Sequence, residues 1–171
     1  MKSLTEHLSN YACYHRDSRN ILTHMFGIPM IVVAIVILLS RPTFSLLGLP
    51  LTPALLLSIA AVIFYFRLSK LFAAVMAFLL LLCLIVGEQI AMQSTAQWLI
   101  TGIGLFVVGW IFQFIGHYYE GRKPAFVDDI IGLLIGPLFV VAEVLFALGL
   151  CSSLQQAIEQ RVAQQMAPPK P

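Results

Sequence analysis

The sequence predicts an all-α integral membrane protein with four to five transmembrane helices in a compact bundle, an N-terminal interfacial helix and a short C-terminal helix. Of the 171 residues, 60% are apolar and only 11% are charged, whereas a soluble domain has about 45 to 50% apolar and about 25% charged residues. A chain of this length cannot bury such an excess in one core, so lipid must solvate part of it. The apolar residues also form long stretches separated by short polar connections, as expected for membrane-spanning helices.

The chain is expected to form a single membrane-embedded domain, 1–171. Residues 1–20 are polar and aromatic and predict a polar helix; they lack the apolar segment and cleavage site of a secretory signal, so we expect this end to be retained. Residues 21–150 form the helical membrane bundle. Residues 151–171 form a polar tail whose helical periodicity predicts a short surface helix.

Five apolar stretches are candidates for spans, and a helix needs about 20 residues to cross a bilayer. The second and third are short and are separated only by RLSK, which predicts a tight helical hairpin. The last contains Gly136, Pro137 and the ionisable Glu143, so it either spans or re-enters, and a re-entrant helix would return the tail to the cytoplasm. Glu143 is expected to bond to a neighbouring helix or to the site. The stretches run roughly from Ile21 to Ser40, Leu51 to Phe66, Leu71 to Gly87, Gln97 to Ile115 and Ile130 to Leu150.

The distribution of cations predicts a cytoplasmic N-terminus, because Lys and Arg near span ends remain on the cytoplasmic side. If all five stretches cross, seven cations lie inside and three outside. The protein is then expected in the inner membrane of a bacterium or in the endoplasmic reticulum of a eukaryote. The inner group is Lys2, Arg16, Arg19, Arg67, Lys70, Arg122 and Lys123, and the outer group is Arg41, Arg161 and Lys170.

The first polar motif, ahead of the first span, contains Tyr11, His15, Asn20 and His24. On one unbroken helix, the nine residues between His15 and His24 turn through about 900°, which would place the two rings on opposite sides. Asp17 and the adjacent serine are good N-caps, so we expect one helix to end near His15 and a second to begin just after it. That break would let the two histidines converge.

A second polar motif follows the fourth stretch. Gln113, His117 and Glu120 are spaced by four and three residues and share one face if the helix continues past the apolar run. With the N-terminus inside, His15, His24 and His117 lie at the same membrane surface. The neighbouring residues also have interpretations without a catalytic role. Arg122 and Lys123 can anchor the chain at the lipid headgroups, Asp128 and Asp129 can cap a helix, and His7 is expected at the surface.

Three histidines beside carboxylates in a chain that otherwise avoids polar residues suit a divalent metal, and imidazole ligands leave both iron and zinc open. The alternative is a non-enzymatic small membrane protein, lipid-binding or transporter-like, in which the polar clusters anchor helices. Four histidines are too few for the clusters of a membrane di-iron hydroxylase. The net charge of +2, without a basic run, indicates no nucleic-acid partner. The three scattered cysteines are expected to be ordinary small apolar residues.

The motifs YxxxHxxxxNxxxH, GWIFQFIGHYYEGRKPAFVDD and GPLFVVAEVLFALG resemble the small membrane 2-hydroxy fatty acid dioxygenases, a yeast-type family of the endoplasmic reticulum that acts in phytosphingosine breakdown. The resemblance runs from about Tyr11 to Leu150. It implies an Fe(II)-dependent dioxygenase that carries out alpha-oxidation, shortening a 2-hydroxy fatty acid by one carbon with O2 and no organic cofactor. The expected partners are the hydroxy acid, O2 and membrane lipid.

The resemblance also implies the site residues. His15, His24 and His117 match the metal ligands, and Tyr11 and Asn20 match accompanying site positions. The acidic candidates for a further ligand are Glu120 and Asp128; the spacing from His117 to Glu120 is one residue shorter than in the yeast-type pattern. Arg122 and Lys123 are expected to steer the substrate carboxylate.

Overall fold

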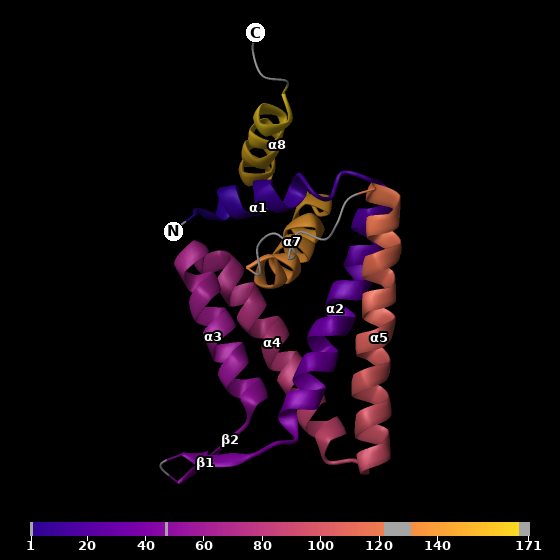
Figure 1. Cartoon of the computed structure of the whole chain (residues 1–171). Helices are drawn as coiled ribbons and strands as arrows, with labels where there is room; N and C mark the ends of the chain where they lie inside the picture. The colour runs from indigo at the N-terminus through magenta and orange to yellow at the C-terminus, as the bar shows by residue number, and fades with distance from the viewer. Residues whose placement is uncertain (1, 47, 122–130, 168–171) are drawn as a thin grey trace. The chain divides into compact units, whose positions relative to one another are not determined.

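The computed structural model describes residues 2–46, 48–121 and 131–167, and these residues are almost entirely helical (Figure 1). The prediction of an all-α membrane protein is confirmed: among the described residues, α2, α4 and α5 are long and apolar enough to cross a membrane, and the bent pair α7 and α8 would make a fourth. The elements are α1 (Leu4–Ala12), α2 (Ser18–Ser40), β1 (Phe44–Leu46), β2 (Leu49–Leu51), α3 (Pro53–Leu68), α4 (Lys70–Ala91), α5 (Thr95–Glu120), α7 (Gly132–Ala147) and α8 (Ser152–Met166).

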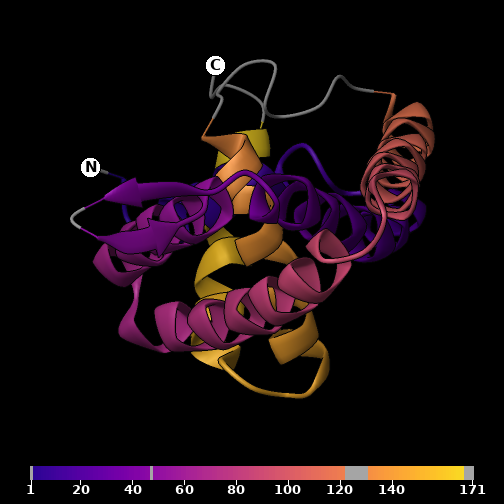
Figure 2. The ribbon, with the colours of Figure 1, turned by 90° about the horizontal axis from the view of Figure 1, so that it is seen from below.

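The chain divides into two compact units, and the first to be described is residues 26–112. It contains the predicted helical hairpin, since α3 and α4 lie side by side (Figure 1, Figure 2). Ser69 alone separates them: its N–H donates to the carbonyl of Tyr65 to end α3, and its hydroxyl caps α4 by accepting from the N–H of Phe72. A serine that closes one helix and opens the next explains how so short a connection reverses the chain.

Within the same unit, α2 and α5 approach closely at small residues. A Cβ on Gly109 of α5 would lie 2.9 Å from the carbonyl oxygen of Gly27 on α2. Close backbone approach at small residues is the usual packing of membrane helices, where apolar side chains gain little from leaving lipid. In agreement, many large apolar side chains of the unit point outward; Ile100, for example, is 72% exposed.

The other unit comprises residues 1–25 and 113–171. In it α1 lies between α7 and α8 and contacts both (Figure 1). A capping box between Ser3 and Glu6 starts α1, and the Glu6 carboxylate also accepts a 2.8 Å bond from Arg161 of α8. The surface position expected for His7 is wrong: because α1 is covered on two sides, His7 is only 7% exposed.

The last apolar stretch forms α7, which is 16 residues long and is followed by a sharp turn at Gly149 and Cys151, both with positive φ. The axis of α8 is inclined by 118° to that of α7. α8 packs on α1, and the bent pair of α7 and α8 fits either a broken span or a re-entrant segment.

Candidate metal centre

The chain between α1 and α2 bends where the sequence predicts a break. α1 ends at Ala12 and α2 begins at Ser18. The Asp17 carboxylate accepts a 2.8 Å bond from the N–H of Arg19, which satisfies one of the unpaired donors at the start of α2. The bend turns the ring of His15 toward the first turns of α2.

Glu120, at the end of α5, holds this bend in place. Its carboxylate accepts bonds of 2.9 to 3.0 Å from the backbone N–H groups of Arg16 and Asp17, and a 2.9 Å bond from the side-chain amide of Asn20. A negative charge at the N-terminus of α2 is also favoured by the helix dipole. Glu120 therefore fastens the start of α2 to the end of α5.

The residues of α5 that face this bend form one buried stripe, Gln113, Gly116 and His117, with the partly buried Glu120 one turn further along. This confirms the predicted shared face. Gly116 is required there: an added Cβ would collide with the Thr23 hydroxyl and lie 2.5 Å from Oδ1 of Asn20. The absence of a side chain lets the start of α2 approach α5 closely enough for the histidines to meet.

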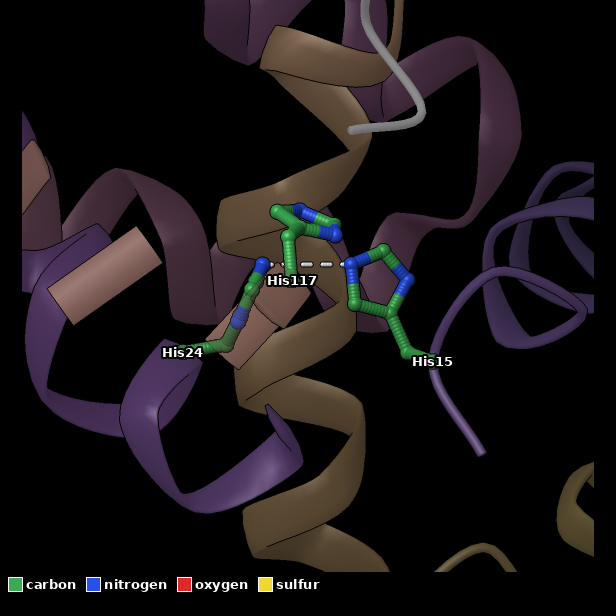
Figure 3. Close-up of side chains that lie close together, drawn as sticks. All are labelled: His15, His24 and His117. Carbon is green, nitrogen blue, oxygen red and sulfur yellow. Dashed lines mark hydrogen bonds between the residues drawn. The ribbon is translucent and has the colours of Figure 1, made fainter. Parts of the chain in front are cut away.

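His15, His24 and His117 converge and all three are buried, and Figure 3 shows their rings turned toward one another. The ring centroids are 4.5 to 5.2 Å apart. Nε2 of His15 lies 3.1 Å from Nε2 of His24, and one potential ligand atom from each of the three residues lies within 4.8 Å of the others. The three predicted ligands thus form one cluster.

The hydrogen bonds of two of these rings decide which nitrogen carries the proton. Nδ1 of His15 lies 2.7 Å from the carbonyl oxygen of Tyr11, and Nδ1 of His24 lies 2.9 Å from that of Asn20. A carbonyl only accepts, so each Nδ1 must be the donor, and each neutral ring then presents a lone pair at Nε2. Two lone pairs facing each other at 3.1 Å repel unless a cation lies between them.

A proton shared between the two Nε2 atoms does not supply that positive charge at neutral pH. Burial lowers the pKa of His15 to about 4, so its ring is neutral at neutral pH. The Tyr11 ring stacks flat on that of His15, with centroids 4.1 Å apart, and Phe139 packs 5.0 Å from Tyr11. Burial likewise raises the pKa of the Tyr11 phenol. These aromatic rings keep water away from the cluster.

A divalent metal ion fits the donor set. Two nitrogens bound at about 2.1 Å to one ion stand roughly 3.0 to 3.4 Å apart at octahedral or tetrahedral angles, and the Nε2 atoms of His15 and His24 already have such a separation. Metal-bound imidazoles usually donate their other N–H to a carbonyl or carboxylate, as both of these rings do. A potential ligand atom of the third imidazole, His117, lies within 4.8 Å of those of the other two.

The structure places the other predicted site residues as follows. Tyr11 and Asn20 adjoin the cluster, whereas Glu120 holds the bend and does not belong to the three-histidine group. Glu143 is half-buried and close enough to Glu159 of α8 and to Arg16 for electrostatic interaction. Arg122, Lys123 and Asp128 lie outside the described residues.

Sequence reasoning missed two contributors to the site. Phe139 packs against Tyr11 although more than a hundred residues separate them, and apolar residues on a helix carry no sign of such a contact. The carbonyl groups of Tyr11 and Asn20 fix the tautomers, and a spacing of four residues before each histidine was the signal that could have revealed them.

The fold and the site define a small helical membrane protein with a buried three-histidine centre beside the start of its first long helix. A profile of the family described as "2-hydroxy-palmitic acid dioxygenase Mpo1-like" matches residues 1–148. The chain belongs to this Mpo1-like family. It is 32% identical over 159 residues to the 2-hydroxy-palmitic acid dioxygenase MPO1 of Saccharomyces cerevisiae, covering 91% of this chain and 87% of the yeast protein. No solved structure matches the chain.

Proposed function

We propose that this protein is an Fe(II)-dependent dioxygenase that carries out alpha-oxidation of 2-hydroxy fatty acids at a membrane surface. The name of the yeast relative supports the substrate class and the reaction. The observation that carries the proposal is the arrangement of His15 and His24, whose Nε2 lone pairs face each other beside the buried side chain of His117.

The overall reaction is balanced by one molecule of O2. The bond between C1 and C2 of the hydroxy acid breaks, C2 becomes the carboxyl carbon of an acid one carbon shorter, and C1 leaves as CO2. The organic substrate loses four electrons, and O2 takes them up in the new carboxyl group, CO2 and one water. No separate organic reductant is needed.

The residues of the chain have distinct roles in this proposal. His15, His24 and His117 hold the iron, which supplies the redox chemistry with O2 when it is bound. The carbonyl groups of Tyr11 and Asn20 orient two of the rings. Tyr11 also shields His15 from water, and Glu120 keeps the bend against α5.

The position of the centre suits an amphiphilic substrate. His24 lies in the second turn of α2 and His117 in the last turn of α5, so the cluster belongs to the end of the spans where the N-terminus lies. In the proposal this end faces the cytoplasm. The acyl chain would remain among the spans, Arg122 and Lys123 would attract the carboxylate, and Asp128 is a candidate for a further ligand.

The test is incubation of the purified protein with 2-hydroxypalmitic acid, Fe(II) and O2, followed by mass analysis. We expect the acid one carbon shorter, at most trace product with zinc in place of iron, and loss of both bound iron and product in His117→Ala. His7→Ala is the matched control, because His7 is buried in the same unit but lies outside the cluster. Full activity of His117→Ala, or no bound iron after reconstitution, would refute the proposal and favour the non-enzymatic alternative.

A further inference from the structure

Gln113 is a buried polar side chain for which the proposed metal centre has no use. It is 6% exposed, and its amide nitrogen Nε2 is buried and has no hydrogen-bond partner among the described residues. It lies on the buried stripe of α5, one turn before His117. In a helix surrounded by lipid, leaving an amide donor unpaired costs free energy, so such a residue indicates a functional position.

Asn20 carries the complementary group. It is fully buried, and its Oδ1 also has no hydrogen-bond partner within the described part of the chain. Its Nδ2 donates to the Glu120 carboxylate. That bond fixes the orientation of the amide, because a flip would bring Oδ1 against a carboxylate oxygen. The free atom of Asn20 is therefore an acceptor.

Helical spacing places the residues that carry the free donor and the free acceptor at neighbouring positions around Gly116. Oδ1 of Asn20 lies 2.5 Å from the point where a Cβ of Gly116 would be. Gln113 is three residues before Gly116 on the same buried stripe, a spacing at which Cβ atoms on a helix are about 5 to 6 Å apart. Each amide also stands one turn before a histidine of the cluster, His24 or His117.

We propose that Gln113 and Asn20 bind the 2-hydroxyl group of the substrate, and this inference rests on the proposed function. A hydroxyl group donates and accepts at once. Nε2 of Gln113 would donate to the hydroxyl oxygen, and Oδ1 of Asn20 would accept the hydroxyl hydrogen. A carboxylate complements only the donor, since it has no hydrogen to offer to Asn20.

This pair gives the site a way to distinguish hydroxylated from plain fatty acids. A fatty acid without the 2-hydroxyl group would bury both amides unsatisfied, and sites built around a substrate hydroxyl discriminate strongly against analogues that lack it. The apolar chains of the two acids are the same, so a difference in their affinities arises at the 2-hydroxyl group, and the inference assigns it to the two amides.

The test is equilibrium binding to the iron-loaded protein without O2, so that no turnover occurs. We expect the wild-type protein to bind 2-hydroxypalmitic acid more tightly than palmitic acid. In Gln113→Met, which has a similar length and no donor, the ratio of the two affinities should fall by about tenfold or more, mainly through weaker binding of the hydroxy acid. Gln89→Met, the same change at an exposed position of α4, should leave the ratio unchanged.

Two further readouts keep the hydroxyl role separate from other roles of Gln113. Bound iron should stay stoichiometric in Gln113→Met, and the thermal midpoint of the metal-free variant should be unchanged or higher, because a buried unsatisfied donor has been removed. An unchanged affinity ratio would overturn the inference and assign the two amides to a buried water. Loss of iron, or a lower midpoint, would overturn it in favour of a structural role.

Failure of the inference is distinguishable from failure of the proposed function. If only the inference is wrong, wild-type protein still forms the shortened acid and Gln113→Met forms it with the same preference for the hydroxy acid. If the proposed function is wrong, the wild-type protein itself forms no shortened acid.

Discussion

Gly116→Ala is the sharpest test of the close approach that assembles the centre. The new methyl group would collide with the Thr23 hydroxyl and lie 2.5 Å from Oδ1 of Asn20 and 3.1 Å from Nδ1 of His24. Ordinary contacts of this kind need at least about 3.4 Å, so the start of α2 must move away from α5 by roughly 1 Å. Overpacking of this kind costs about 1 to 3 kcal/mol in stability.

The same movement separates His24 on α2 from His117 on α5. Because metal sites need their ligands within about 0.5 Å of the correct geometry, and disturbed support of ligands typically reduces affinity by about 10 to 100-fold, we expect metal affinity to fall by at least that factor. The assay is competition for iron or zinc against a coloured chelator, with circular dichroism to confirm that the helices persist.

Gly104→Ala is the matched control on the same helix. Apart from α5 itself, no atom of the described residues lies within 4 Å of the position where its Cβ would be. Replacing a helical glycine by alanine there should leave metal affinity unchanged and stabilise α5 by about 0.5 to 1 kcal/mol. Wild-type metal affinity in Gly116→Ala would refute the reasoning, because the histidines could then meet without the close approach of α2 and α5.

The other predictions concern the bend, the aromatic shield and the topology. Glu120→Gln should lower the free energy of unfolding of the metal-free protein by about 1 kcal/mol after allowance for solvent screening, measured as a lower thermal midpoint. One metal ion per chain should still bind at saturation; loss of stoichiometric metal would make Glu120 a ligand after all. Tyr11→Phe should keep both bound metal and activity, because the ring stack and the backbone carbonyl remain, whereas Tyr11→Ala should weaken metal binding by exposing His15; equal losses in both would point to the phenol hydroxyl. In sealed vesicles, a protease should reach tags at both chain ends from the same side, and tags on opposite sides would exclude a re-entrant α7.

Much of the fold follows from residue patterns because lipid imposes them. Long apolar runs predict α2, α4 and α5, and the short RLSK connection predicts the α3–α4 hairpin, since Ser69 can both end and begin a helix. The fate of the last stretch stayed open, because Gly136 and Pro137 are compatible with a broken span and with a re-entrant helix. The contact of this stretch with α1 is long-range, and the residues of the stretch itself do not reveal it.

The site was predictable only where local helical geometry controls it. The break near Asp17 and the shared face of Gln113 and His117 follow from caps and spacing. The burial of His7 and the bonds of Glu120 depend on how α1 and α5 pack against other segments. A carboxylate three residues after a histidine is a candidate metal ligand by sequence, although here Glu120 accepts bonds from backbone N–H groups.

The repeated spacing of four residues before each histidine has a physical reason. In a helical turn the carbonyl at one position lies near the side chain four residues later, so Nδ1 of His15 and of His24 can bond the carbonyls of Tyr11 and Asn20 whatever side chains those residues carry. The backbone carbonyls thus set the tautomers of the two histidines. The side chains of Tyr11 and Asn20 do not take part in those bonds and can make other contacts. The Tyr11 ring stacks on His15, and the Asn20 amide donates to Glu120. The glutamine before His117 is the third member of the pattern, and its free amide donor is the reason to look for its partner in the substrate.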